Sequence, residues 1–149
     1  MEMLIRNYED SDFRFVKEIL VESFPEVEDS LSKALVDFSS LNIDKNKYIQ
    51  LVAEDGGIIM GYALVSRCFD PVLCKVNFWI DYVCVAENFR GKGIGKKLLQ
   101  KIEKIAISEN VMYLQLTSSK FRTNARKLYM DMGYEIRESD IFRKVLKWE

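Results

Sequence analysis

The spacing of apolar residues along the first third of the chain predicts a strand followed by two helices. Residues 3–8 are typical of a short strand, and the polar residues 10–12 can cap a helix that Pro25 ends. The apolar face of that helix would be Phe13, Val16, Ile19, Leu20 and Phe24. A second helix can begin at Asp29 or Ser30. Its apolar positions would be Leu31, Ala34, Leu35, Phe38 and Leu41.

The middle of the chain predicts a hairpin followed by a buried strand. Residues 47–55 and 58–69 have the apolar and β-branched content of strands, and Gly56 and Gly57 lie in the turn between them. The next predicted strand, residues 75–85, is apolar on both faces. Such a strand is expected at the centre of a sheet, where both of its faces are covered.

The last part of the chain predicts two helices and further strands. One helix would follow the glycines of residues 91–95, with Ile94, Leu98, Ile102 and Ile105 on one face. Residues 111–117 resemble a strand, Gly133 can stop a helix over residues 123–133, and the rest of the chain would hold one or two closing strands.

This order, β-α-α-β-β-β-α-β-α-β, predicts an α/β (α+β) fold. We expect one mixed sheet with helices on both faces. The length of 149 residues suits a single domain spanning residues 1–149, and no stretch of the sequence resembles a linker.

Composition excludes several kinds of site. A net charge of −1 argues against a nucleic-acid or acidic-membrane surface. The chain has no histidine, and its cysteines (Cys68, Cys74 and Cys84) lack metal-ligand spacing. We therefore expect no metal site and no histidine-activated nucleophile. We expect the thiols to be buried in the protein and the protein to lie in a reducing compartment.

The sequence also lacks the marks of a membrane protein. No apolar run reaches the roughly 18 residues that suggest a membrane-spanning helix, and residues 1–12 contain no apolar signal core. We expect a cytoplasmic protein with no membrane partner.

Residues 90–97 place three glycines and four cations at the predicted start of a helix. Lys96 and Lys97 are unfavourable there, because the helix dipole is positive at its N-terminus. An anionic ligand would remove the conflict, and such departures from local rules often mark functional sites. The alternative is an ordinary glycine-rich turn with solvated lysines.

Of three kinds of phosphate-binding loop, only one matches this stretch. A P-loop would need glycine where Arg90 stands and Ser or Thr where Lys97 stands. A dinucleotide-binding turn needs G-x-G-x-x-G, whereas these glycines run G-x-G-x-G. The R-x-x-G-x-G pattern of a coenzyme A pyrophosphate loop fits Arg90, Gly93 and Gly95.

The flanking residues extend this match. The stretch "VCVAENFRGKGIGKKLL" resembles the central motif of the GNAT superfamily of N-acetyltransferases, and "RTNARKLYMDMGYE" resembles the motif that follows it. The opening "IRNYEDSDF" is similar to the family's first strand and helix start. The resemblance covers nearly the whole chain. It implies an acetyl-CoA-dependent N-acetyltransferase in which a primary amine of a small molecule or peptide attacks directly.

The resemblance also implies where acetyl-CoA binds, with no metal involved. Backbone groups of Val83, Cys84 and Val85 would pair with the pantetheine arm like an added strand. Many members carry an asparagine that contacts the cofactor where this chain has Arg122, and a subset of the family has arginine there. Arg122 is therefore expected near the cofactor, with its contact undefined. The pyrophosphate loop begins at Arg90, and its backbone N–H groups would be those of Gly91, Lys92, Gly93, Ile94, Gly95 and Lys96.

Two residues are candidates for the chemistry. Tyr129 aligns with the family's usual general acid, although its place four residues after Ala125 also suits a core tyrosine. Asp81 lies within the apolar strand, in phase with Val83 and Val85. It is either a base acting through water, as proposed for some diamine acetyltransferases, or an aspartate that only orders the site.

The acceptor and the rival functions stay open. In this fold the loop between the first two helices often lines the acceptor pocket. Here it is an acidic rim that would attract a cationic amine, or a solvated loop.

Rival functions are a non-catalytic acyl-CoA-binding or sensing module and a nucleotide-binding protein. Homodimers are common in the family, so a homodimer is possible. The acidic residues of the loop between the first two predicted helices are Glu22, Glu26, Glu28 and Asp29.

Overall fold

The computed structural model describes residues 2–25 and 41–147, which form two compact units. Unit 1 ends at Thr117 and unit 2 begins at Ser118. Unit 1 contains β1 (Leu4–Asn7), η1 (Asp10–Asp12), α1 (Phe13–Ser23), β2 (Tyr48–Asp55), β3 (Ile58–Asp70), β4 (Lys75–Val85), η4 (Glu87–Phe89), α3 (Ile94–Ser108) and β5 (Leu114–Leu116). Unit 2 contains α4 (Thr123–Asp131). Within the described residues, none of the helices has the length and apolar character of a membrane span.

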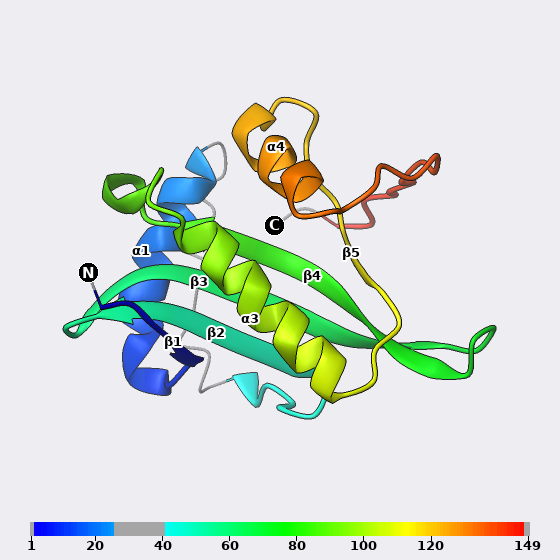
Figure 1. Cartoon of the computed structure of the whole chain (residues 1–149), viewed down its shortest axis with the longest axis horizontal. Helices are drawn as coiled ribbons and strands as arrows, with labels where there is room; N and C mark the ends of the chain where they lie inside the picture. The colour runs from blue at the N-terminus through cyan, green and yellow to red at the C-terminus, as the bar shows by residue number, and fades with distance from the viewer. Residues whose placement is uncertain (1, 26–40, 148–149) are drawn as a thin grey trace. The chain divides into compact units, whose positions relative to one another are not determined.

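Unit 1 is built on a mixed sheet of five strands in the order β1-β2-β3-β4-β5 (Figure 1). The first four strands pair antiparallel with their neighbours, and β5 pairs parallel with β4. The β2–β3 hairpin closes through Gly56 and Gly57, with φ of 57° and 85°. A two-residue turn of this kind requires positive φ at both positions. The predicted hairpin is confirmed. Residues 75–85 form a strand as predicted, with β3 on one side and β5 on the other, but β5 pairs with only part of its length.

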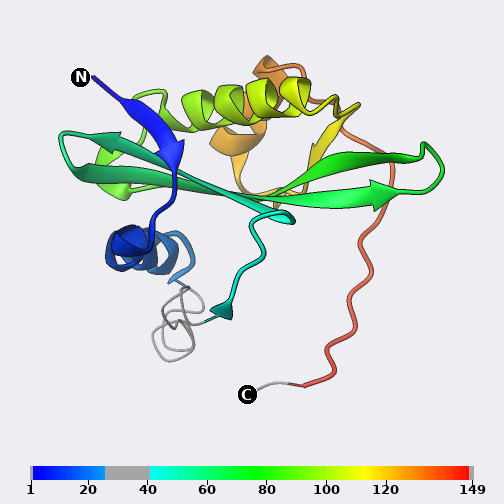
Figure 2. The same cartoon turned by 90° about the horizontal axis from the view of Figure 1, so that it is seen from below.

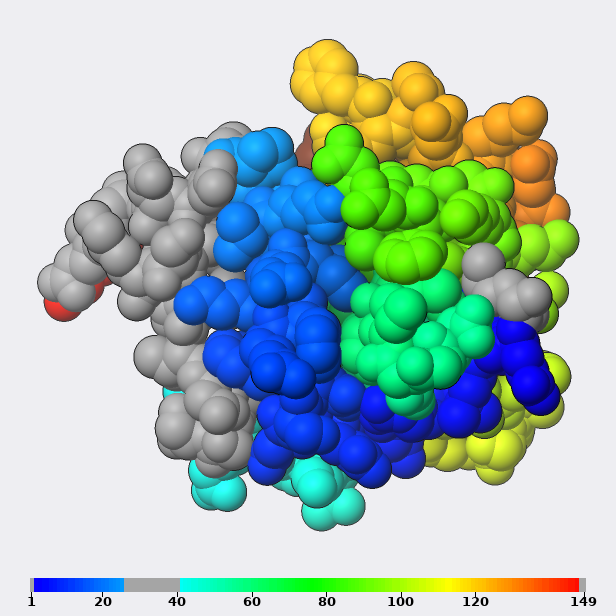
Figure 3. Space-filling view, turned by 90° about the vertical axis from the view of Figure 1, so that its left-hand side faces the viewer, coloured from blue at the N-terminus to red at the C-terminus, as the bar shows by residue number. Residues whose placement is uncertain are grey.

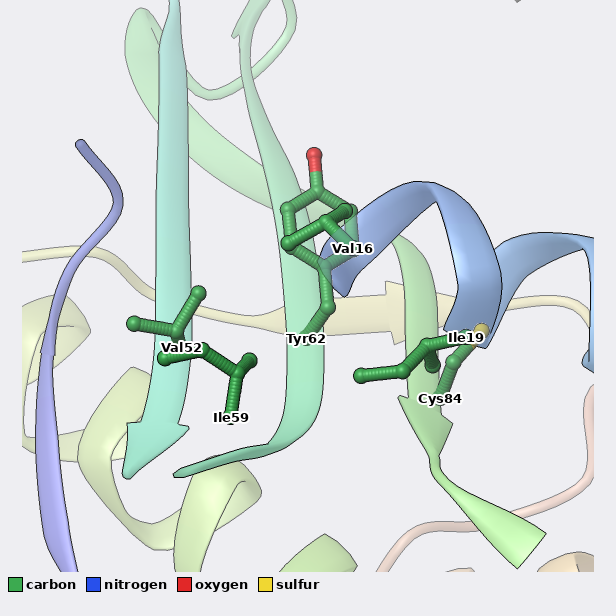
Figure 4. Packing of buried hydrophobic residues seen from close by; sticks show 6 residues of the cluster. All are labelled: Val16, Ile19, Val52, Ile59, Tyr62 and Cys84. Carbon is green, nitrogen blue, oxygen red and sulfur yellow. The ribbon is translucent and has the colours of Figure 1, made fainter. Parts of the chain in front are cut away.

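The two helices of unit 1 lie on opposite faces of the sheet (Figure 2). We call these the α1 face and the α3 face. On the α1 face, Val16 and Ile19 of α1 pack against the sheet residues Val52, Tyr62 and Cys84 (Figure 4). The predicted mixed sheet with helices on both faces is therefore confirmed.

Helix α3 approaches its face of the sheet closely because β3 carries a glycine there. A Cβ atom at Gly61 would lie 3.1 Å from a methyl carbon of both Ile94 and Leu98. The buried residues of α3 recur at helical spacing, as the sequence predicts, although Ile105 is only half-buried. These buried residues are Ile94, Leu98, Leu99, Ile102 and Ala106.

Three predictions about local structure need correction. Residues 134–147 form no strand, because alternating apolar residues become a strand only where a neighbour pairs with their backbone. The strand predicted over residues 111–117 is limited to β5. Cys84 is buried as expected, but Cys68 and Cys74 are exposed, since both lie towards the tip of the β3–β4 hairpin. The predicted second helix falls mainly on residues 26–40, outside the described residues.

An ion-pair cluster joins the first strand to the start of α1 and to β2. The Arg6 guanidinium donates hydrogen bonds to both carboxylate oxygens of Asp12, at 2.8 and 2.9 Å, and Nε donates to Glu54 at 2.7 Å. Asp12 also accepts from the backbone N–H of Glu9, and its side chain is only 6% exposed. These bonds, chiefly those from Arg6, hold the pKa of Asp12 below its ordinary value.

We expect Asp12→Asn to lower the free energy of unfolding by roughly 1.5–3 kcal/mol at pH 7, because it weakens charge-assisted hydrogen bonds at a buried site. The pKa of Asp12 is lower in the folded state than its ordinary value. The ionised carboxylate therefore contributes its full stabilisation of the fold above the ordinary pKa, and this stabilisation is lost as pH falls through the folded-state pKa. Urea denaturation between pH 7 and pH 3 measures both effects.

Asp10→Asn is the matched control, because Asp10 lies in the same turn, is exposed and has no ion pair in the described part of the chain. Equal losses in the two variants, or an unchanged acid dependence in Asp12→Asn, would contradict the role given to Asp12.

Candidate functional site

Strand β4 has an edge that β5 covers only in part. The parallel pairs are Phe78 with Leu114, Trp79 with Gln115 and Ile80 with Leu116, and pairing stops there. Strand β4 nevertheless continues to Val85. Beyond Ile80, no strand within residues 2–25 or 41–117 pairs with this edge.

The backbone groups that face this open edge can be identified from the antiparallel ladder with β3. The N–H of Ala86 donates to Met60 O at 2.8 Å. Along an antiparallel ladder, hydrogen-bonded pairs alternate with pairs that are not hydrogen-bonded. Cys84 is therefore hydrogen-bonded to β3, whereas the N–H and C=O groups of Val83 and Val85 point to the open edge. Within the predicted trio, the open-edge groups therefore come from Val83 and Val85.

A β-bulge in β4 sets the direction of Asp81. Tyr82 lies opposite Leu64 and Ile80 lies opposite Val65, which leaves Asp81 as an extra residue on β4. Its carboxylate accepts a hydrogen bond from the Ser66 hydroxyl. Ser66 lies two residues from Leu64, which packs against the core of the α1 face, so Asp81 points to that face.

The expectation that Asp81 is in phase with Val83 and Val85 is therefore wrong. Val85 lies opposite Gly61, whose missing side chain would point at α3, so both valines are on the α3 face. One inserted residue reverses the phase of a strand, because side chains alternate with a period of two. The lone serine in the apolar stretch of β3 was not singled out from the sequence, although a small polar residue there is unusual.

The turn between η4 and α3 depends on two glycines in the left-handed region. Gly91 has φ of 78° and Gly93 has φ of 80°, and Gly93 is the residue immediately before α3. A Cβ atom at either position would meet nothing within 4 Å. These glycines are therefore required by the backbone conformation and not by close packing.

Backbone N–H groups at this turn have no partner in the described chain. No hydrogen bond from the N–H groups of residues 91–96 is found there, and no side chain caps α3. The first helical bond of α3 is from Lys97 N to Gly93 O, at 3.1 Å. Unpaired N–H groups and a positive dipole end make this turn suitable for an anion.

The charges around the turn have the same sign. Arg90, Lys92, Lys96 and Lys97 are exposed, α3 has no acidic residue in its first turn, and none of the four cations forms an ion pair within the described residues. The Lys92 ammonium lies over the Phe89 ring, 5.4 Å from its centroid. The turn thus combines N–H donors with a local excess of positive charge.

Arg90 also has a structural contact. Its Nε donates to the carbonyl oxygen of Val85 at 3.0 Å, which links the turn to the last residue of β4. This bond uses one lone pair of an open-edge carbonyl. The side chain predicted to begin the anion loop therefore also fixes the loop to the strand.

One end of α1 is connected to the same region. The Glu22 carboxylate accepts a hydrogen bond from the backbone N–H of Glu87 at 2.9 Å, at the start of η4. Figure 3 shows α1, the Gly56–Gly57 turn and the residues after β4 side by side at this end of unit 1. Glu22 therefore has a structural role in addition to its predicted place in the acidic rim, whose other members (Glu26, Glu28 and Asp29) lie outside the described residues.

Tyr62 is a buried tyrosine of unit 1, and it is a poor proton donor. Its hydroxyl donates to Gln50 Oε1 at 2.6 Å, and the residue is 2% exposed. Burial, with a smaller effect from charges that include Asp81, raises the pKa of Tyr62 above its ordinary value. An acid role for Tyr62 is disfavoured, whereas its contact with the core is clear.

Unit 2 holds the other two predicted site residues. Arg122 immediately precedes α4, and its carbonyl accepts from Arg126 N at 3.0 Å. Tyr129 lies in α4 and packs edge-to-face on Tyr134, with ring centroids 6.0 Å apart. Gly133, with φ of 90°, follows the helix as predicted.

Comparison with known proteins gives one family match. The model of the acetyltransferase (GNAT) family matches residues 13–134 and so runs across both units. The mouse protein N-acetyltransferase 8B is 26% identical over 105 residues, which are 70% of this chain and 45% of that protein. L-ornithine N5-acetyltransferase NATA1 of Arabidopsis thaliana is 26% identical over 130 residues, 82% of this chain and 57% of that protein.

The chain thus spans about half the length of these relatives, at 45% and 57%. The fold also agrees with solved structures. AAC(6')-Iy, solved with the bisubstrate analogue CoA-S-monomethyl-acetylneamine, superposes with a TM-score of 0.77 at 19% identity, over 97% of this chain and 99% of that one. Because the family model covers most of the sequence, the chain belongs to the acetyltransferase (GNAT) family.

Proposed function

We propose that this protein is an acetyl-CoA-dependent N-acetyltransferase that acts on a primary amine of a small molecule or peptide. The observation that carries the proposal is the succession of an open β4 edge, a left-handed glycine turn and unpaired N–H groups at the start of α3. The family match spans both units, which supports one functional domain over residues 1–149.

The backbone groups of unit 1 that lack partners are of the kinds that coenzyme A would need. The N–H groups of residues 91–96 would bind the pyrophosphate, and the open space above Gly91 and Gly93 leaves room for it. The backbone groups of Val83 and Val85 on the open edge would pair with the amides of the pantetheine arm. Phosphate at this site would also relieve the unfavourable position of Lys96 and Lys97 near the helix N-terminus.

Bound acetyl-CoA supplies an activated acetyl group: the amine nitrogen forms a bond to the thioester carbonyl carbon, the C–S bond breaks, and coenzyme A leaves as the thiol after taking up a proton. The chain would hold the substrates, polarise the thioester carbonyl group and move protons. A backbone N–H on the open edge of β4 would donate to the carbonyl oxygen, where negative charge develops. Tyr129 would deliver the proton to the leaving sulfur.

The acceptor amine must lose a proton to react. A primary ammonium has a pKa near 10, so roughly one molecule in a thousand is neutral at pH 7. The Asp81 carboxylate would attract the ammonium and take its proton through water. NATA1 is named for acetylation of the side-chain nitrogen of ornithine, which is consistent with a primary aliphatic amine as the acceptor here.

The glycine turn can be tested by one substitution with a close control. Gly93→Ala should weaken coenzyme A binding about tenfold, because an L residue in this conformation costs roughly 1–2 kcal/mol and distorts the donor array. Gly56→Ala is the control, because Gly56 also has positive φ and open space but lies in the β2–β3 turn. Calorimetric titration measures both affinities.

Gly56→Ala should lose stability to a similar extent and keep the wild-type affinity. If Gly93→Ala bound coenzyme A as tightly as wild type, the pyrophosphate would not depend on this turn.

Tyr129→Phe separates binding from chemistry. We expect the variant to bind acetyl-CoA with wild-type affinity and to lose roughly 10²–10⁴-fold in turnover, because it lacks the proton that a general acid delivers. Release of free thiol with a panel of primary amines measures turnover. Tyr113→Phe, which removes a hydroxyl bonded to Asp70 in unit 1, should leave turnover unchanged.

Other outcomes distinguish the rival functions. Binding of acetyl-CoA without turnover on any amine would favour an acyl-CoA-binding or sensing module. Preference for ATP or NAD over coenzyme A would refute the proposal altogether.

A further inference from the structure

The β4 bulge brings together two polar residues from different strands. Ser66 of β3 is 9% exposed and is one of few buried polar residues of the described chain. Its hydroxyl donates to Oδ2 of Asp81, the inserted residue of β4. A buried hydroxyl needs a partner, and a carboxylate is a strong acceptor, so each residue restrains the other.

This pair leaves part of the carboxylate available. The Ser66 bond uses Oδ2, and no further hydrogen bond or ion pair to Asp81 is found within residues 2–25 and 41–147. Asp81 is half-buried and therefore not fully screened by water. A carboxylate in this position is stabilised by a cation that can approach it.

Two aromatic residues of β4, Trp79 and Tyr82, lie on the same face of the sheet as the pair. Trp79 lies opposite Ser66 in the β3–β4 ladder, which places both on the α1 face. Tyr82 follows Asp81, is 45% exposed, and packs edge-to-face with Phe24 after α1, with ring centroids 5.5 Å apart. Aromatic rings beside a carboxylate favour alkylammonium groups, because the ring faces attract cations and the rings cover the apolar stem.

We infer that Ser66 is a positioning residue, which holds the Asp81 carboxylate on the α1 face so that it binds the ammonium group of the acceptor between Trp79 and Tyr82. The inference rests on the proposed function for the identity of the bound amine as an acceptor. The open-edge groups of Val83 and Val85 lie in the plane of the sheet, whereas the Asp81 carboxylate leaves it towards the α1 face. Amine and thioester would thus reach β4 from different directions.

In this arrangement, amine binding depends on the Ser66 hydroxyl. Without the Ser66 hydroxyl, the Asp81 side chain can rotate and bind water, and the ammonium site loses its defined geometry. The pyrophosphate turn is formed by residues 91–96 and does not involve Ser66. Loss of the hydroxyl should therefore weaken amine binding and spare coenzyme A binding.

The test is an NMR titration of the coenzyme A-saturated protein with butylamine, a minimal primary amine that does not depend on turnover. In the wild-type protein we expect butylamine to shift the amide resonances of Ser66, Asp81 and Tyr82. Ser66→Ala should raise the apparent Kd for butylamine about tenfold. Ser66→Thr, which keeps the hydroxyl, should have an apparent Kd for butylamine within about threefold of the wild-type value.

Two further measurements separate positioning from a general effect on the fold. Ser108→Ala is the matched control, because the Ser108 hydroxyl donates to Ile105 O at 2.6 Å near the end of α3, outside the proposed site. This variant should bind butylamine like the wild type. In an Asp81→Asn background, Ser66→Ala should cause no additional loss, since the serine acts through the aspartate.

The outcomes are distinct. The inference is overturned if butylamine leaves these resonances unchanged, if Ser66→Ala keeps the wild-type Kd, or if it weakens coenzyme A binding to the same extent as butylamine binding. Butylamine binding that depends on Ser66, in a protein that acetylates no amine, would keep the ammonium site and refute the proposed function instead.

Discussion

Parallel pairing between β4 and β5 stops at Ile80 and Leu116, although β4 continues to Val85. Unpaired backbone groups at a sheet edge require a partner or water. In unit 1 the next residues are η4 and the glycine turn, so the open edge leads directly to the N–H donors at the start of α3. A ligand with amide groups at one end and phosphate at the other matches this succession of donors and acceptors.

The unusual backbone of the turn is stabilised by ordinary packing and hydrogen bonds around it. Helix α3 is held to the sheet by its row of buried aliphatic residues and by the close approach that Gly61 permits. The Arg90 bond to Val85 and the Glu22 bond to Glu87 fix the two ends of η4. Local departures from regular structure persist when their surroundings determine them in this way.

The bulge also separates two kinds of polar group on one strand. Before it, Phe78 and Ile80 are buried and pair with β5. At the bulge, the Asp81 carboxylate turns to Ser66 on the α1 face, and after it Val83 and Val85 present backbone groups at the open edge. The side-chain carboxylate and the open-edge backbone groups thus lie close together on β4 but point in different directions.

The sequence by itself determined most of the helices and strands and the glycine turn before α3, because both depend on local residue types. Apolar periodicity located β2, β3, β4 and α3, and the glycines of residues 91–95 located the turn before α3. The sequence also suggested Asp81 from its charge within an apolar strand. It predicted closing strands after residue 134 that are absent from the described residues 134–147, since strand formation depends on a neighbour and not on alternation alone.

Only the tertiary structure decided the direction of Asp81 and its partner. The inserted residue in β4 reverses the phase of the strand, and its effect is defined only when β3 is beside it. The partnership with Ser66, 15 positions earlier in the chain, arises from that pairing. Register and backbone direction belong to pairs of strands, which is why the two open-edge valines, like the serine, could not be identified from one strand alone.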